Sequence, residues 1–256
     1  MPLSEQARMN LATLFPGVAS TLPETDPELV EYFGNFAFDE VLRESKMDAR
    51  TRLMLLLGAL IASQPTREYA VMLGAALTVG VTPVEIKEVL YQAIPYVGMS
   101  KALDYIDVTN EALVTHGTTL PLPSQSITTA ANCFEKGLAV QKQIFGDVID
   151  RRQASTPKDQ QHIMRYLSAN CFGDNYTRTG LDVPIRELLT FAILIALEGC
   201  EPQVKGHIAG NLRVGNDRAR LIDTVTQLLP FIGYPRSLNA LRAIDEVVSA
   251  AGGDHG

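Results

Sequence analysis

One histidine of this chain has the setting that acid–base chemistry requires. His207 follows a helix start at Glu201-Pro202 and stands near two small residues, Gly206 and Gly210, which leave room for a ligand or a neighbouring helix. An imidazole titrates near neutral pH, so it can protonate a carbanion after loss of carbon dioxide. The alternative is a hydrogen-bonded histidine of the core. We select His207 as the first candidate catalytic residue.

Two further side chains close to His207 in the sequence are candidates for the same chemistry. Cys200 precedes the same helix, where the helix dipole lowers the pKa of a thiol; the alternative is a small buried apolar residue. Glu187 stands in the first turns of a long apolar helix, where a carboxylate either faces a pocket or favours the N-terminal dipole. The other two cysteines, Cys133 and Cys171, have no catalytic context, and we assign them to packing.

Composition excludes several classes of protein. A chain of 256 residues with 46% hydrophobic content can bury one large core or two modest ones. It carries 29 acidic and 22 basic residues, a net charge of −7, and no basic run that could follow a phosphate backbone. The most apolar segment, Leu53–Ala62, is too short to span a bilayer. We therefore expect a cytoplasmic protein that binds neither nucleic acid nor a membrane.

Metal and disulfide chemistry are also unexpected. Three widely separated cysteines form no CxxC pair and suit a reducing compartment. The histidines show neither an HExxH motif nor the Cys/His spacing of zinc sites, so we predict no metal and no cofactor; they are His116, His162, His207 and His255.

The chain contains the same string of features twice. MDARTRLMLLLGALIAS and YQAIPYVG in the first half correspond to LDVPIRELLTFAILIAL and TQLLPFIG in the second. Arg52 corresponds to Arg186, and Gly80 corresponds to Gly215 with one residue inserted between these two points. We predict a first repeat over residues 1–116 and a second over residues 126–256. The connector, residues 117–125, is rich in Gly, Thr, Ser and Pro.

Both repeats must be helical. Apolar residues recur at the helical spacing of three and four, and no segment alternates with the period of a strand. Thr82-Pro83 followed by Glu85 is a capping box, and a glycine ends a helical run at Gly80 and at Gly215. The prolines of the shared motif, Pro95 and Pro230, should kink or end their helices. The sequence predicts an all-α protein.

The second repeat resembles the carboxymuconolactone decarboxylase family. FGDNYTRTGLDVPIRELLTFAILIALEG, KGHIAGNLRVG and QLLPFIGYP carry the resemblance, and the first repeat carries it more weakly. The family shares its fold with alkylhydroperoxidase-D-like proteins, which implies two fused repeats of that fold. In the peroxidase branch, a glutamate precedes a C-x-x-C-x-x-x-H motif. The matching residues here are Glu187, Cys200, Gln203 and His207.

This chain departs from the peroxidase motif. Gln203 replaces the second cysteine, so the dithiol mechanism is lost. The first repeat has Leu53 at the position of Glu187 and Met72 at that of His207, so we expect a structural copy without a site of its own.

The resemblance implies a substrate with carboxylates. The namesake substrate of the family is a lactone bearing such groups, and guanidinium groups bind them well. Arg213 and Arg178 are the candidate ligands for them, and Tyr176 is a candidate pocket residue. Arg186 has a counterpart in the repeat that lacks the histidine, so a structural ion pair or cap is its favoured role.

We expect a cofactor-independent decarboxylase, or a related lyase or isomerase, that acts on a small carboxylated lactone with His207 as acid or base. Two alternatives stay open. Cys200 would serve a single-cysteine peroxidase resolved by an outside thiol, and the degenerate first repeat would suit a non-catalytic binding or scaffold protein. Single-repeat members of the family form rings, so we also expect a homotrimer in which three chains provide six repeats.

Overall fold

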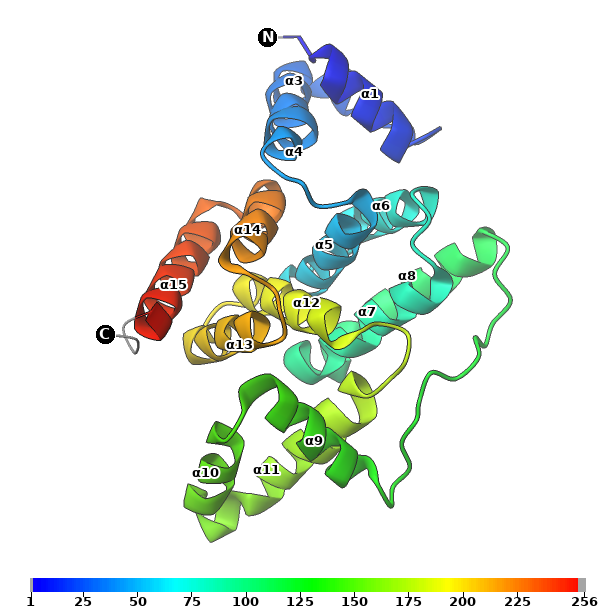
Figure 1. Ribbon diagram of the computed structural model, residues 1–256. Coiled ribbons are helices and arrows are strands. Elements are labelled where there is room, and N and C mark those ends of the chain that lie inside the picture. The colour runs from blue at the N-terminus through cyan, green and yellow to red at the C-terminus, as the bar shows by residue number, and fades with distance from the viewer. Residues whose placement is uncertain (1, 253–256) are drawn as a thin grey trace.

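The computed structural model describes residues 2–252, and every regular element in this range is a helix (Figure 1). This confirms the predicted all-α class. The first half contains α1 (Glu5–Leu14), α2 (Leu22–Thr25), α3 (Pro27–Asn35), the π-helix η1 (Phe36–Glu40), α4 (Val41–Arg43), α5 (Ala49–Ser63), α6 (Thr66–Thr78), α7 (Pro83–Val97) and α8 (Met99–Thr115).

The second half repeats this order. It contains α9 (Cys133–Phe145), α10 (Val148–Ser155), the 3-10 turn η2 (Lys158–Gln160), α11 (Gln161–Tyr166), the π-helix η3 (Leu167–Tyr176), α12 (Val183–Ala196), α13 (Glu201–Arg213), α14 (Arg218–Ile232) and α15 (Tyr234–Gly252). Helices α5 to α8 thus correspond to α12 to α15, and a π-helix precedes each set.

The two repeats pack through their first long helices. Helix α5 lies against α12 at the centre of the molecule, and both are buried along almost their whole length. Gly58 permits the close approach, because a Cβ there would lie 2.5 Å from the Cδ1 atom of Leu189. One continuous hydrophobic core therefore includes residues from both repeats.

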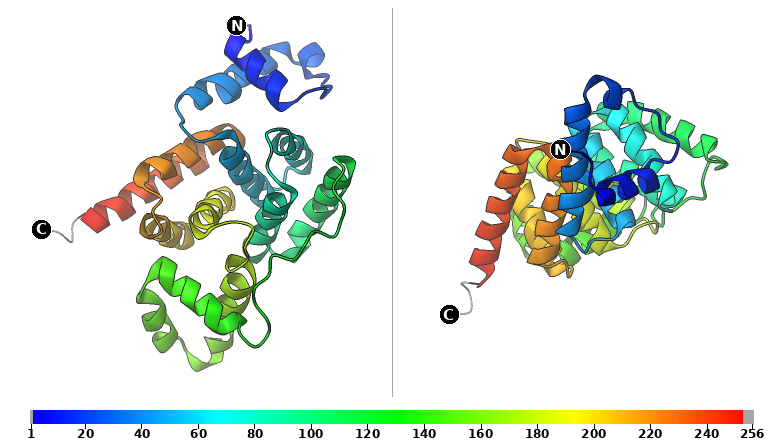
Figure 2. Two further views of the ribbon diagram at one scale, coloured as in Figure 1. Left: turned by 45° about the vertical axis from the view of Figure 1, so that its right-hand side comes forward. Right: turned by 90° about the horizontal axis from the view of Figure 1, so that it is seen from above.

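Further helices of each repeat also pack against the other repeat. Helix α7 of the first repeat packs against α12 and η3 of the second, and α14 of the second packs against α5 and α4 of the first. The leading helices lie at opposite ends of the molecule, α1 to α4 at one end and α9 to α11 at the other (Figures 1 and 2). Helix α7 is thereby brought beside the helices that carry the candidate site.

The expected local signals define the helix ends. Thr82 and Glu85 form the capping box of α7, and Gly80 and Gly215 have φ of +85° and +98°. Pro95 and Pro230 lie in the last turns of α7 and α14, which end two residues later. All of these agree with the sequence patterns.

The segment between the two sets of helices forms no helix between Thr115 and Cys133, and the predicted connector, residues 117–125, lies within it. Its central part lies along α7 and α8, where Leu120 and Gln125 line a cavity. Among the described helices, none combines the length and the apolar character needed to cross a membrane.

Two glycines let α9 lie directly on η3. A Cβ on Gly137 would be 1.9 Å from the carbonyl oxygen of Ser168, and one on Gly173 would be 2.2 Å from that of Cys133. The two backbones therefore touch without intervening side chains. This contact positions Phe172 and Tyr176 of η3 at the candidate site.

Gly137→Ala should lower the free energy of unfolding by about 1–3 kcal/mol, because its Cβ meets backbone that must move. Gly74→Ala is the matched control, since open space surrounds a Cβ there. Because alanine has a higher helix propensity than glycine, Gly74→Ala should raise the free energy of unfolding by about 0.5–1 kcal/mol. Urea unfolding followed by circular dichroism measures both, and wild-type stability of Gly137→Ala would contradict the backbone contact.

Candidate functional site

The structure pairs the two residues that the sequence selected for acid–base chemistry. The Nδ1 atom of His207, on α13, lies 2.9 Å from Oε2 of Glu187, on α12. The Glu187 side chain is fully buried, and about a tenth of the His207 side chain (10%) is exposed. With Nδ1–H donating to the carboxylate, Nε2 is left to exchange protons. Glu187 thus faces the interior rather than serving as a dipole partner at the surface.

Tyr176 completes the environment of the carboxylate. Its hydroxyl donates to Oε1 of Glu187 at 2.7 Å and lies 2.6 Å from Oγ1 of Thr190. Burial, and next the nearby Glu187 charge, raise the pKa of Tyr176 well above its usual value, so the phenol stays protonated. Both oxygens of Glu187 therefore accept a hydrogen bond inside the protein.

Asparagines fix the distance between the two site helices. The side-chain amide of Asn211 donates to the backbone oxygens of Glu187 and His207, at 3.0 and 2.7 Å. Asn216 donates to Oδ1 of Asn211 and to the carbonyl of Pro184. These bonds hold α13 against α12.

Two aromatic rings form walls around the imidazole. The ring of Phe145, at the end of α9, is 5.3 Å from that of His207, and the ring of Tyr96, near the end of α7, is 6.1 Å away; both are edge-on. Gly210 keeps this space tight, because a Cβ there would lie 2.6 Å from Oε2 of Glu187. The site is thus built from α7, α9, η3, α12 and α13.

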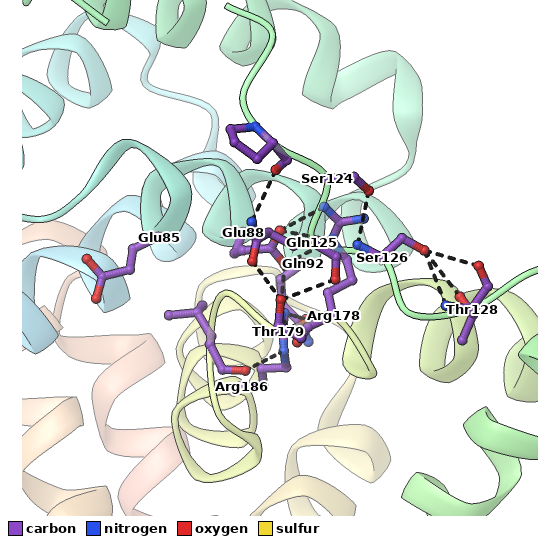
Figure 3. A network of polar contacts seen from close by, with 12 residues as sticks. Glu85, Glu88, Gln92, Ser124, Gln125, Ser126, Thr128, Arg178, Thr179 and Arg186 are labelled. Carbon is purple, nitrogen blue, oxygen red and sulfur yellow. Dashed lines mark hydrogen bonds and ion pairs between the residues drawn. The ribbon is translucent and has the colours of Figure 1, made fainter.

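A second polar cluster lies where α7 meets α12 (Figure 3). Glu88 is buried and accepts hydrogen bonds from Arg186 at 2.8 Å and from Nε of Arg178 at 2.9 Å. Arg186 also donates to Gln92 at 3.0 Å, and Gln92 donates to Thr190 at 3.1 Å. Hydrogen bonds thus run without a break from the ion pairs to the residues around Glu187. Arg186 thus forms a structural ion pair, the role that its counterpart Arg52 in the first repeat suggested.

The remaining sequence candidates lie apart from the pair. The guanidinium of Arg213 lies across the end of α9, about 3.0 Å from the position of a Cβ on Gly146. Arg178 is bound to Glu88 and lines a cavity that includes neither His207 nor Glu187. Of the residues considered for substrate binding, Tyr176 contacts Glu187 directly.

Cys200 borders another cavity, of about 430 Å³, whose lining includes neither His207 nor Glu187. Its thiol donates to the carbonyl of Leu194 at 3.2 Å. Burial, and next the charge of Glu201, raise the pKa of this thiol. The helix N-terminus therefore does not yield a low thiol pKa here.

Of the other two cysteines, Cys171 borders the candidate site, because its thiol donates to the hydroxyl of Tyr96 at 3.9 Å. Burial raises the pKa of Cys171 to about 12, and Cys133 is half-buried at the start of α9. Among residues 2–252, no three His, Cys, Asp or Glu side chains gather in a way that could hold a metal ion. His255 lies outside the described residues.

The first repeat has a packed core at the equivalent position. Leu53 and Met72 are buried where Glu187 and His207 stand in the second repeat. The first repeat is nevertheless more than a structural copy, because Tyr96, Gln92 and Glu88 of its helix α7 reach the second repeat's polar network.

The selection of site residues from the sequence missed Tyr96, Thr190 and Asn211. A signal for Tyr96 was present, because Gln92 and Tyr96 belong to the motif Q-x-x-P-[YF]-[VI]-G that occurs in both repeats. Signals for the other two were also present, since Thr190 lies three residues after Glu187 on α12 and Asn211 four residues after His207 on α13, the spacings that place side chains on one face of a helix.

The fold and the site define a class of protein: two fused all-α repeats with a buried histidine–glutamate pair in the second. The model of the carboxymuconolactone decarboxylase family matches residues 27–111 and 161–246, together more than half of the chain. The chain belongs to this family. It is 26% identical over 120 residues to the 4-carboxymuconolactone decarboxylase of Acinetobacter baylyi, which covers 46% of this chain and 89% of that protein.

A double-mutant cycle tests whether the pair is a stabilising feature. Glu187→Leu and His207→Met should each lower the free energy of unfolding by about 1–3 kcal/mol, because each leaves a buried polar partner unsatisfied. The double variant copies Leu53 and Met72, so its stability should return close to that of the wild type. Chemical unfolding measures all four proteins. A double variant as unstable as the sum of both single changes would contradict this expectation.

Proposed function

We propose that this protein is a cofactor-independent decarboxylase, or a related lyase or isomerase, that acts on a small carboxylated lactone. The observation that carries the proposal is the buried pair of His207 and Glu187, because its geometry leaves Nε2 as a proton donor and acceptor. Membership of the family and the likeness to a 4-carboxymuconolactone decarboxylase support the class of substrate.

The proposed step is a proton transfer coupled to loss of carbon dioxide. The bond between the ring carbon and the carboxylate breaks, carbon dioxide leaves, and the electron pair stays on the carbon. Protonated His207 gives its Nε2 proton to that carbon and then takes a proton from solvent. The reaction consumes one proton and needs no oxidant or reductant.

Glu187 and Tyr176 act on this step through His207. The carboxylate holds the imidazole in one orientation, with Nδ1 towards Glu187 and Nε2 free for proton transfer, as an acidic partner does in other histidine-based sites. Tyr176 and Thr190 hold the carboxylate in turn. They are positioning residues.

Arg213 is the better placed candidate for a substrate carboxylate. No carboxylate of the described residues pairs with it, whereas Arg178 lines a cavity that includes neither His207 nor Glu187. Its guanidinium lies at Gly146, which directly follows Phe145, and the Phe145 ring faces His207. Guanidinium and imidazole therefore lie near the same end of α9.

Turnover of 4-carboxymuconolactone tests the proposal. His207→Ala should lower kcat by about 10²–10⁴-fold, the usual contribution of a general acid. His162→Ala is the matched control, because His162 is exposed on α11 and should leave turnover unchanged. Release of carbon dioxide measures the rate. Absence of turnover by the wild type, or equal turnover by His207→Ala, would contradict the proposal.

We also propose a homotrimer. Both repeats expose a pair of large apolar side chains at the start of the last helix, Met99 and Leu103 on α8 and Tyr234 and Leu238 on α15. They are 49–61% exposed and occupy equivalent positions. If the α8 face of one chain packs on the α15 face of the next, three chains close a ring and cover every such pair.

Light scattering tests the trimer. The wild type should have three times the chain mass of 27.9 kDa. The variant Leu103→Glu/Leu238→Glu places charges on both faces and should have the mass of one chain. Leu22→Glu, at an exposed leucine of α2, should keep the wild-type mass. A wild type with the mass of a single chain at micromolar concentration would overturn the ring.

A further inference from the structure

A cavity of about 550 Å³ lies beside the candidate site, between α7 and the connector. Helix α7 contributes Lys87, Glu88 and Tyr91, and the connector covers it with Leu120 to Gln125. The cover is anchored, because Thr179 donates its backbone N–H to the carbonyl of Gln125 at 3.1 Å and its hydroxyl to Oε1 at 2.6 Å (Figure 3). The volume is typical of a site for a small molecule.

The cavity carries excess positive charge. Glu88 is the only carboxylate in its lining, and Arg178 and Arg186 both bind it. Lys87 adds a third cation; it is only 9% exposed, and its ammonium contacts the side-chain oxygen of Asn110. No carboxylate of the described residues lies within ion-pair distance of Lys87. A lysine that lines a cavity and has no counter-ion there provides a favourable position for an anion.

The two cations that line the cavity, Lys87 and Arg178, both lie over the ring of Tyr91. The guanidinium of Arg178 is 5.0 Å from the centre of its ring, and the ammonium of Lys87 is 5.9 Å from it. Burial lowers the pKa of Lys87, and an anion beside it would oppose that effect. Lysine, arginine and an aromatic ring on one wall are the groups that bind a small organic anion.

The second repeat offers an internal comparison. Its equivalent cavity lies along α14, with Ile222 in the place of Lys87 and Thr226 in the place of Tyr91. Glu44 stands where Arg178 stands in the other cavity. Three cations do line this second cavity, but four carboxylates line it with them: Lys46, Arg218 and Arg220 stand beside Glu44, Asp48, Asp217 and Asp223. The repeated fold therefore forms such a cavity without an excess of positive charge, so packing does not explain the excess in the first.

We propose that the cavity between α7 and the connector binds a small organic dianion, a dicarboxylate or a phosphorylated compound, through Lys87 and Arg178. This site is separate from the proposed active site, because neither His207 nor Glu187 lines it. It remains joined to that site through Glu88, Arg186 and Gln92.

A fluorescence titration of the full chain tests the proposal. The chain has no tryptophan, so Tyr91→Trp places a single indole in the cavity wall and keeps an aromatic surface for the cations. Succinate and inorganic phosphate are the probes, and neutral succinamide is the control ligand. We expect a saturable change with succinate, phosphate or both, and none with succinamide. The response to each identifies carboxylate or phosphate as the recognised group.

Matched variants separate this site from general charge effects. Lys87→Gln, added to the Tyr91→Trp protein, should weaken binding of the anionic probe by about tenfold to hundredfold, as expected for loss of a charged hydrogen bond. Lys101→Gln removes an equal charge from the exposed face of α8 and should change nothing. Thr226→Trp places the reporter in the second cavity and should not respond.

Adding His207→Ala to the Tyr91→Trp protein should leave binding unchanged, so the outcome does not depend on the proposed catalysis. Circular dichroism establishes that each variant is folded. Absence of a saturable response to both probes would overturn the proposal. An equal loss of affinity with Lys101→Gln, or an equal response of the Thr226→Trp protein, would overturn it as well.

Discussion

A buried guanidinium joins the two halves of this molecule. Arg186 is fully buried at the start of α12, and an uncompensated charge in that position would be strongly unfavourable. Glu88, which neutralises it, and Gln92, which accepts a further hydrogen bond from it, both come from the other repeat. Loss of one partner of such a pair typically costs about 3–5 kcal/mol. The packing of α7 on α12, the place of Tyr96 and the cavity beside Glu88 all depend on this contact.

The equivalent contact between α5 and α14 lacks these hydrogen bonds. Arg52 is buried on α5, and no hydrogen bond joins it to Asp223 or Gln227, the counterparts of Glu88 and Gln92. Both of these side chains keep a buried oxygen without a partner. Aspartate is one methylene shorter than glutamate, so its carboxylate stands further back on α14. The repeats therefore share a framework but differ in the polar network that supports a site.

Much of the fold could be predicted because its signals are local. The duplication, the cap at Thr82 and the turn glycines depend on residues a few positions apart. The site was harder, since its contacts join distant segments: Gln92 and Thr190 are 98 residues apart. His207 and Glu187 could be selected singly, by residue type and resemblance. Their contact depends on how α13 packs on α12, which spacing alone does not specify.

Fusion of two repeats in one chain allows each repeat to change independently of the other. In a pair of identical subunits, every substitution occurs in both copies, so a site lost in one is lost in the other. Here the first repeat has Leu53 and Met72 in place of the glutamate–histidine pair and still contributes Tyr96 to the environment of His207. Its α7 also carries Lys87, for which the second repeat has Ile222. The first repeat thus contributes to the site of the second repeat, and its own α7 has diverged from α14 at the cavity that it lines.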